Sequence, residues 1–484
     1  MMAAGTLIET ALRRSALLGI VVVGAVALLY LPAFPGAFHF DDYAFLWDNP
    51  RLDEPGIAAD LLLEFYGGRP LTMLSFLAQQ AAGATSAAPF LAVNLLLHLA
   101  AVALLFAALL RWDGDARVAF LAALWFGVHP VQTQAVEYIW SRSVPAAFVF
   151  GLAAFLLAQR PLRALGGWQI AVLWRADALL WAGPLVRANR RCLKPILFLG
   201  GLNVFWLAYG AWLNGTQGFV LPLREWPQYW AEVPAAYLQN LAMLVWPVGQ
   251  SLAHPPPPSG LVWFLGGTGV LLSLFLIAER ASEGRPWLKM GVTGLHWFLL
   301  PILLVPNPYH VHESRLYPAV ACAAWIWGRI AVGLWDYVRA RRFGWPGSGG
   351  ALLAAALWLA GFAHGTWQRH AIWKDDVALW REAAARDPAD FAVHYNLGVA
   401  YSRAGRFAEA EEAFRRALRL NPADDLSYAG LAYCREMQGD EGGAAYLYEM
   451  ALRLAPENLF ARSGRLRTKC RVPRQTDPER RNVP

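Results

Sequence analysis

Apolar segments of membrane-spanning length recur along the first three quarters of the sequence. A transmembrane helix needs roughly 17 to 25 predominantly apolar residues. Nine segments approach or reach this length: Ser15–Ala33, Phe90–Leu110, Val118–Val128, Val144–Ala158, Pro195–Leu213, Leu261–Ala278, Met290–Val305, Tyr317–Leu334 and Ala351–His364. The composition agrees, because 57% of the residues are hydrophobic and 16% are charged, whereas about 25% are charged in soluble proteins. The sequence therefore predicts an all-α fold with a polytopic membrane domain.

A tenth apolar segment, Trp168–Val186, is interrupted by Arg175 and Asp177. It fits either a hairpin of two short helices or one buried span. Lys and Arg in short loops mark the cytoplasmic side of a membrane, and they fill alternate loops here, from Arg13–Arg14 to Arg339–Arg342. With the interrupted segment counted as a hairpin, they predict about eleven spans, a cytoplasmic N-terminus on a retained signal anchor, and an extracytoplasmic C-terminal domain.

The membrane-like composition ends near residue 366. We predict a membrane domain at 1–366, a soluble helical domain at 367–461 and a basic disordered tail at 462–484. The tail holds eight Lys and Arg against Asp477 and Glu479, and it carries most of the net charge of +7. A short basic tail is most often solvated, so we expect no nucleic-acid partner.

Two repeats follow in the soluble part. Residues 391–424 and 425–458 align without a gap, each with the period of 34 residues that is typical of tetratricopeptide repeats. Small residues such as Ala410 and Ala444 recur where two antiparallel helices must approach, and a partial repeat ends at Pro388. We predict a short α-solenoid, which is typical of a docking module and offers a site for a protein partner.

Ionisable residues gather in the loops predicted on the outer face. They are Asp41, Asp42, Glu64, Arg69, His129, Glu137, Arg142, His310, His312, Glu313 and Arg315. Charge at the centre of a bilayer costs at least ~2.5 kcal/mol on insertion scales, so such residues tend to line a wet cavity or to pair. Asp is also a common helix cap, and an interfacial Arg commonly meets only lipid headgroups. His310, His312 and Glu313 have a spacing that could hold a metal, but a hydrogen-bonded loop is favoured there.

Two features favour chemistry over these simpler interpretations. Adjacent carboxylates at Asp41 and Asp42, among aromatic residues, would raise the pKa of one of them towards that of a general base. Several arginines facing those carboxylates suit phosphate, because guanidinium binds it through two parallel hydrogen bonds.

These motifs, taken in order, give a family resemblance. The sequence contains "FHFDDYAFLWDNPRL", "GRPLTMLSF", "NLLLHLAAVALLF", "GVHPVQTQAVEYIWSRSVPAAFVF", "YLQNLAMLVWPVGQSLAH" and "HESRLYPAVA", followed by the junction "TWQRHAIWKDDVALWREAAARDPADFAVHYNLGVAYSRAGRFAEA". It resembles the transmembrane and tetratricopeptide-repeat O-mannosyltransferase-like proteins of the GT-C glycosyltransferase superfamily, in a bacterial type. It departs from the family pattern in the short hairpin, where Arg175 and Asp177 replace a Ser-Lys-Glu motif, and in "ESR", where the family has "ER".

The resemblance implies a multi-pass enzyme of a bacterial inner membrane that uses a polyprenyl-phosphate-linked sugar, mannose-like, on the extracytoplasmic face. The acceptor is a hydroxyl of a protein or a glycan. By resemblance, Asp41 and Asp42 are candidates for the catalytic base, with Asp42 slightly preferred, and Arg315 is the candidate for the lipid phosphate. No cofactor is required, although a divalent metal is compatible with the site.

The remaining expected site residues are helpers. Arg69, Arg142 and His312 would assist in binding the donor phosphate, and the supporting residues are His129, Glu137, Glu313, Arg175 and Asp177. We expect a single inverting displacement. The alternatives are a lipid-linked polysaccharide ligase or polymerase, a non-catalytic scaffold, and a transporter. A scaffold does not require the aspartate pair, and a transporter would favour charges deep within the spans.

Overall fold

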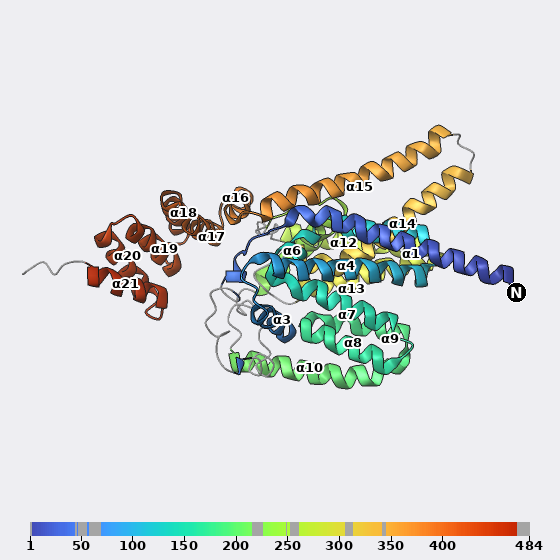
Figure 1. The fold of residues 1–484 in the computed structure, drawn as a ribbon, viewed down its shortest axis with the longest axis horizontal. Coiled ribbons are helices and arrows are strands. Elements are labelled where there is room, and N and C mark those ends of the chain that lie inside the picture. The colour runs from blue at the N-terminus through green and yellow to red at the C-terminus, as the bar shows by residue number, and fades with distance from the viewer. Residues whose placement is uncertain are drawn as a thin grey trace, which may run out of the picture. The chain divides into compact units, whose positions relative to one another are not determined.

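The computed structural model describes residues 2–43, 46, 56–57, 69–214, 226–247, 249–251, 261–304, 313–340 and 345–471, and every regular element among these residues is a helix (Figure 1). The chain divides into two units. The membrane unit comprises Met1–Gln250 and Pro256–Lys374, and the repeat unit comprises Ser251–Pro255 and Asp375–Pro484. Helix α15, Trp345–Trp373, runs through the boundary predicted at residue 366, and so the membrane unit ends later than expected.

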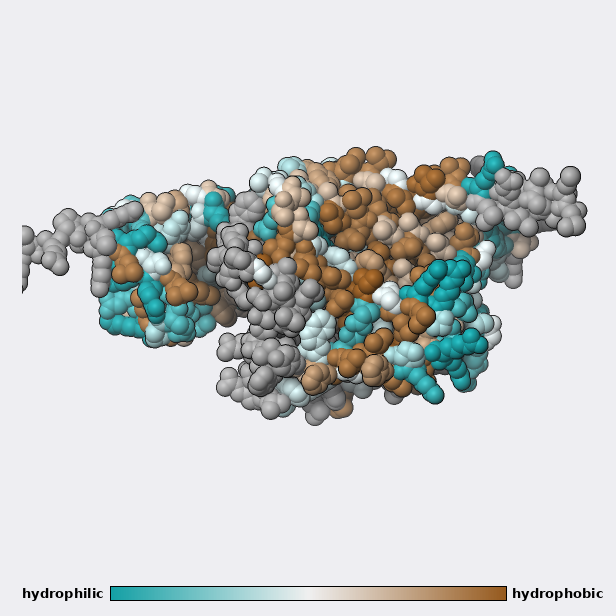
Figure 2. Space-filling model, turned by 60° about the horizontal axis from the view of Figure 1, so that its bottom comes forward, coloured by the Kyte–Doolittle hydropathy of each residue, from teal (hydrophilic) through white to brown (hydrophobic). Residues whose placement is uncertain are grey.

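The membrane unit is built from long apolar helices and several short ones. Their bounds are α1 Met2–Tyr30, η1 Leu31–Ala33, α3 Pro70–Ala81, α4 Ala87–Asp113, α5 Ala116–Val128, α6 Gln132–Glu137, η5 Ile139–Arg142, α7 Ser143–Leu156, α8 Pro161–Trp174, η6 Ala176–Trp181, α9 Ala182–Ala188, η7 Arg190–Cys192, α10 Leu193–Asn214, α11 Trp226–Val245, α12 Leu261–Ser282, α13 Pro286–Leu304, η9 Glu313–Leu316, α14 Tyr317–Ala340 and α15. Hydrophobic residues cover much of the face of this unit that Figure 2 presents.

Four segments of the described residues are long and apolar enough to cross a membrane. They are Arg13–Ala33, Ala87–Asp113, Ile139–Leu156 and Glu313–Ala340, and the shorter helix α5 is also apolar. These helices indicate a membrane protein. The count of about eleven spans and the sidedness of the loops stay predictions.

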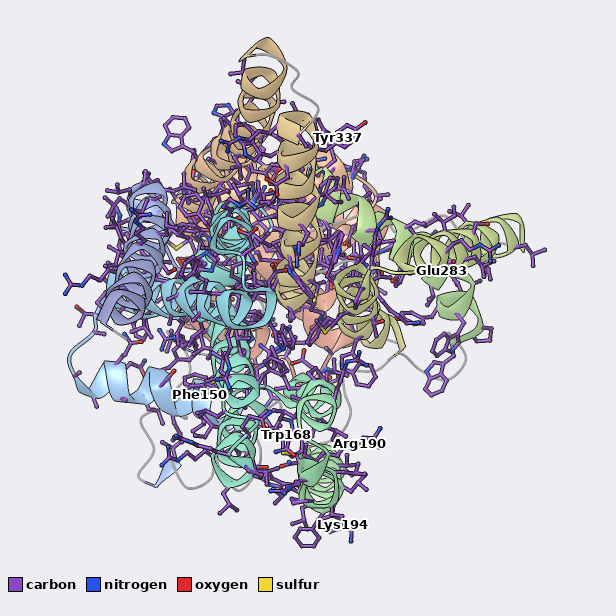
Figure 3. All side chains as sticks on the ribbon, turned by 90° about the vertical axis from the view of Figure 1, so that its right-hand side faces the viewer. Phe150, Trp168, Arg190, Lys194, Glu283 and Tyr337 are labelled. Atoms are coloured by element: carbon purple, nitrogen blue, oxygen red, sulfur yellow. The ribbon has the colours of Figure 1, made fainter. Side chains whose placement is uncertain are left out.

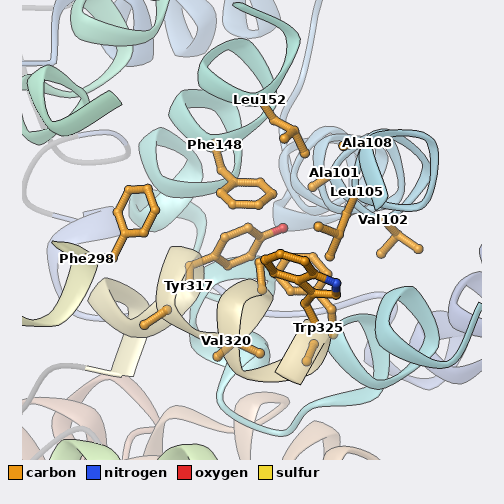
Figure 4. Close-up of a cluster of buried hydrophobic side chains, with 14 of the residues drawn as sticks. Ala101, Val102, Leu105, Ala108, Phe148, Leu152, Phe298, Tyr317, Val320 and Trp325 are labelled. Atoms are coloured by element: carbon orange, nitrogen blue, oxygen red, sulfur yellow. The ribbon is translucent and has the colours of Figure 1, made fainter. Parts of the chain in front are cut away.

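Helices α4, α5, α7 and α14 pack around a buried tyrosine. Phe148, Leu105 and Val320 lie around Tyr317 in Figure 4. The Tyr317 hydroxyl and Nδ1 of His98 are 2.7 Å apart, and Nε2–H of His98 donates to the Gly127 carbonyl at 3.2 Å. Because that carbonyl can only accept, Nδ1 accepts the Tyr317 proton. The His98 ring and the Tyr317 hydroxyl are thus both satisfied within the core, and they join α4, α5 and α14.

The interrupted segment forms a hairpin of short helices. Helix α8 ends at Trp174, and the chain turns at Arg175. Helices η6 and α9 then lead back in the opposite direction and end at Ala188. Trp168 closes the hairpin because its Nε1–H donates to the Ala178 carbonyl at 3.1 Å. Of the two forms compatible with the sequence, the structure has the hairpin, and its tip carries Arg175 and Asp177.

The repeat unit has the helix pairs that the 34-residue period predicts. Its helices are α16 Asp376–Arg386, α17 Phe391–Arg403, α18 Phe407–Leu420, α19 Asp425–Met437, α20 Glu441–Leu454 and α21 Leu459–Arg471. Four of them begin after an aspartate that accepts a backbone N–H of the first turn: Asp375, Asp390, Asp424 and Asp440. Aspartate is a favoured N-cap because its carboxylate satisfies these exposed donors.

The predicted disordered tail begins too early. Residues 462–471 belong to α21, which packs through Ala461 and Thr468, both fully buried. Arg467 donates to both carboxylate oxygens of the buried Glu436 at 3.0 Å each. The basic composition of these residues suggested a solvated tail. The structure shows a helix instead, because Glu436 of the second repeat neutralises Arg467.

The Phe414 ring fits between two glycines of neighbouring helices. An added Cβ would lie 2.7 Å from this ring at Gly398 and 2.5 Å from it at Gly430. We expect Gly430→Ala to destabilise the repeat unit by about 1–3 kcal/mol, because overpacking forces the buried ring to move. Gly442→Ala is the control, since a Cβ there meets nothing within 4 Å and alanine favours a helix. Hydrogen–deuterium exchange of α17–α19 in the full chain should quicken for Gly430→Ala alone, and equal exchange in both variants would contradict this packing.

Candidate active site

Asp42 is fully buried in the first loop, which follows η1, and backbone donors hold both of its oxygens. The His39 N–H donates to Oδ2 at 3.0 Å, and the Trp140 N–H donates to Oδ1 at 2.7 Å. Burial raises the pKa of Asp42 to about 7, although His39 and the two N–H groups oppose that rise. This carboxyl therefore joins the first loop to the loop that precedes α7.

His39 fixes the same loop to the end of α15. Its Nε2–H donates to the Trp373 carbonyl at 2.6 Å, and its ring meets the Trp373 ring edge-on. Phe40, the next residue, has φ 39° and leaves its side chain 38% exposed. A left-handed backbone conformation is unfavourable for an aromatic residue. It persists where the surrounding structure enforces it, often at functional sites.

Asp41 lies beside Tyr138 and within the field of Arg69. Burial raises the pKa of Asp41, whereas the Tyr138 hydroxyl and the Arg69 charge partly lower it. Asp41 is half-buried, and so it is the more accessible carboxyl of the pair. Tyr138 in turn stacks on Trp373. Asp42 is thus enclosed by the protein, and its neighbour Asp41 is partly exposed.

Arg69 lies close enough to Arg175 and Arg315, which come from separate segments, to be repelled by both. The pKa of Arg69 is lowered to about 10, chiefly by burial and then by the charges of Arg175 and Arg315, while Asp177 opposes them. Arg175 pairs with Asp177, with 2.6 Å between Nε and Oδ2. Arg69 thus lies near Asp41, near the hairpin tip and near Arg315. We call Arg69, Arg175 and Arg315 the arginine cluster.

Arg142 faces protein groups. It is fully buried, and its guanidinium donates to Asn94 Oδ1, Ser75 Oγ and the Phe90 carbonyl, each at 2.9 Å. The Phe76 ring centroid lies 4.4 Å from its guanidinium carbon. This geometry favours a role in fixing α3, α4 and the loop before α7, whereas the sequence suggested direct contact with phosphate.

His129 is engaged through both ring nitrogens. Its Nε2–H donates to the Leu244 carbonyl at 3.2 Å, and Nδ1 accepts the Val131 N–H at 3.3 Å. Burial lowers the pKa of His129 to about 3, so the ring is neutral. It thereby connects the turn after α5 to α11.

The two buried glutamates also lie where segments meet. Glu137 Oε1 is 2.6 Å from His370 Nδ1, and the His370 Nε2–H donates to the Leu29 carbonyl at 3.0 Å. Glu313 begins η9, whose Ser314 N–H donates to Gln134 Oε1 at 2.7 Å. These contacts hold α1, α6, η9 and α15 at the end of the membrane unit where Asp41 lies.

Some expected site residues cannot be placed. Glu64, His310 and His312 lie outside the described residues. Within the described ranges, no three His, Cys, Asp or Glu side chains are placed to hold a metal ion. Conversely, His39, Tyr138 and Trp373 received no role from the sequence, although each belongs to a quoted motif.

The two units together define a membrane protein that carries tetratricopeptide repeats. Residues 391–424 match the tetratricopeptide repeat family, which confirms the first predicted repeat.

Several relatives of this chain are named as enzymes. The chain is 32% identical over 242 residues to protein O-mannosyl-transferase TMTC3 of Mus musculus and 26% identical over the same length to TMTC3 of Homo sapiens, in each case 46% of this chain and 25% of the relative. It is also 35% identical over 85 residues to BBSome complex member BBS4 of Mus musculus, which covers 18% of this chain and 16% of the relative. The chain thus aligns with about a quarter of the length of each TMTC3 protein.

Proposed function

We propose that the protein is a membrane glycosyltransferase that moves a mannose-like sugar from a polyprenyl-phosphate donor to a hydroxyl acceptor, a protein Ser or Thr in the first instance. The observation that carries the proposal is the half-buried Asp41 near Arg69, which itself lies within the field of Arg175 and Arg315. The names of the TMTC relatives support it, and they favour a protein acceptor.

The proposed reaction is one displacement at the anomeric carbon. The acceptor hydroxyl attacks this carbon, its proton passes to a carboxylate, and the bond from the carbon to the phosphate oxygen breaks. A phosphate leaves as an anion, so it needs positive charge and no proton donor. The arginine cluster would supply that charge, and a single displacement inverts the anomeric configuration.

The two carboxyls take different roles in this proposal. Asp41 is the base, because it is the more exposed acid and lies within the field of Arg69. Asp42 positions it, because both of its oxygens already accept backbone N–H groups. This assignment reverses the slight preference for Asp42 that the family alignment gave.

A panel of lipid-linked donors tests the function. Membranes containing the full chain are supplied with radiolabelled polyprenyl-phosphate sugars, mannose first, and with peptides rich in Ser and Thr. We expect label to appear on the peptides, above the level in membranes that lack the protein. Transfer of a preassembled glycan alone would indicate a polysaccharide ligase, and no transfer from any donor would leave a scaffold as the better account.

The rate of sugar transfer should fall as the pH is lowered. A base acts when ionised, and burial raises the pKa of Asp41 above its ordinary value. We therefore expect kcat/KM to fall as the pH drops from 8 to 4, with a midpoint above the ordinary aspartate value of about 4. The folded fraction, measured by size-exclusion chromatography at each pH, is the control. A constant rate over this range would contradict the assignment of Asp41 as the base.

A further inference from the structure

Six exposed cations gather at the end of the α8–α9 hairpin opposite its tip. They are Arg160, Arg163, Arg187, Arg190, Arg191 and Lys194, and we call this set the basic edge. Among the described residues, none of the six forms an ion pair with a carboxylate. Asp177 is the one acidic residue in the sequence between positions 143 and 223, and it pairs with Arg175 at the tip. The positive charge of the basic edge therefore lacks a counter-charge from the nearby chain.

Two amide side chains hold the basic turns side by side. The Asn189 Nδ2–H donates to the Ala158 carbonyl at 2.8 Å, and the Gln159 Nε2–H donates to the Ala188 carbonyl at 3.4 Å. The turn after α7 is thereby fixed to the turn after α9. Like charges held together repel one another, so an anion from outside the chain would stabilise this arrangement. Figure 3 shows Arg190 and Lys194 at this edge of the membrane unit.

Exposed apolar side chains alternate with these cations. Leu162 is 86% exposed between Arg160 and Arg163. One turn beyond Lys194, Leu197 and Phe198 of α10 are 67% and 69% exposed. Cations beside exposed apolar residues are typical of a membrane interface, where charge meets headgroups and the apolar side chains enter the acyl region. A soluble anion or an acidic protein would account for the charges but not for these apolar residues.

Arg117, another exposed arginine, is neutralised by carboxylates of the chain itself. Arg117 pairs with both Asp115 and Asp336, at 2.7 Å in each case. The chain thus neutralises one exposed arginine with its own carboxylates and leaves the six at the basic edge without such partners.

We propose that the basic edge binds the headgroups of anionic phospholipids, with the exposed leucines and Phe198 in the adjoining acyl region. This interaction surface is separate from the arginine cluster, and it does not depend on the proposed transferase activity.

Native mass spectrometry of the purified full chain in an uncharged detergent tests the surface. The probes are phosphatidylglycerol and phosphatidylcholine with identical acyl chains. The wild type should bind phosphatidylglycerol more tightly. The triple variant Arg187→Gln, Arg190→Gln, Arg191→Gln should lose about tenfold or more of that affinity and keep its affinity for phosphatidylcholine, because each cation contributes separately to binding an anionic surface.

Matched variants keep the test falsifiable. Neutralising Arg280, Arg285 and Lys289, which are also exposed, should change the affinity less than twofold or so. The triple variant Arg187→Lys, Arg190→Lys, Arg191→Lys should retain binding, which separates lost charge from lost folding. If the triple glutamine variant fails to fold, Arg190→Gln alone should still lower the affinity in part. Equal binding of both lipids by the wild type, unchanged binding by the glutamine variants, or displacement of the lipid by millimolar inorganic phosphate would overturn the proposal.

Discussion

Asp41→Asn should lower the rate of sugar transfer by about 10²–10⁴-fold, the contribution typical of a general base, with donor binding largely kept. The amide is close in shape to the carboxyl but cannot take a proton from the acceptor hydroxyl. The arginine cluster, which would hold the phosphate, is left intact. Single-turnover transfer, measured beside equilibrium binding of the same donor, separates these two effects.

Asp115→Asn is the matched control for this experiment. Asp115 is a partly exposed N-cap of α5 whose side chain accepts the Arg117 N–H, and asparagine caps helices about as well as aspartate. Its transfer rate should equal that of the wild type. If Asp41→Asn retained the wild-type rate, the catalytic base would have to be a different group, and Asp42 would be the next to test.

Arg142→Met should destabilise the membrane unit by roughly 3–5 kcal/mol, because three hydrogen bonds from a charged donor are lost and one buried acceptor is left without a donor. That acceptor is Asn94 Oδ1, while the Phe90 carbonyl and the Ser75 hydroxyl each lose one bond. Methionine replaces the aliphatic stem of the arginine side chain but supplies no N–H. Thermal unfolding of the full chain in detergent, followed by size-exclusion chromatography, should show a loss of several degrees.

The control is the same substitution at an exposed arginine. The Arg117 side chain is 51% exposed, although it makes two ion pairs. Exposed ion pairs contribute little to stability because water screens them, so Arg117→Met should leave the unfolding temperature nearly unchanged. If Arg142→Met were as stable as Arg117→Met but did not bind the donor, Arg142 would bind the donor phosphate directly, as the sequence analysis expected.

The sequence was sufficient for features that depend on local periodicity. The 34-residue period placed the first repeat at 391–424, where the family match and helices α17 and α18 confirm it. The break at Arg175 and Asp177 indicated the hairpin, because charge interrupts an apolar helix there. Both signals arise within a few tens of residues, where spacing along the chain determines which side chains share a face.

The partners of the site residues could not be predicted, because they are distant in the chain. Asp42 accepts an N–H from a residue 98 positions away, and His39 bonds a carbonyl 334 positions away. The sequence gives the charge of Arg142 but not the direction of its guanidinium. A buried arginine and an exposed arginine therefore cannot be told apart from the sequence. For the same reason the sequence did not reveal the Glu137–His370 contact or the ion pair that orders α21.

The most direct test of the central claim is the anomeric configuration of the product made by the purified wild-type protein. Polyprenyl-phosphate mannose of one defined configuration is supplied with a Ser/Thr-containing peptide, and the linkage formed is assigned by nuclear magnetic resonance. Displacement by an acceptor that a carboxylate at Asp41 deprotonates predicts transfer with inversion. Transfer with retention, or no transfer from any polyprenyl-phosphate sugar, would contradict the account.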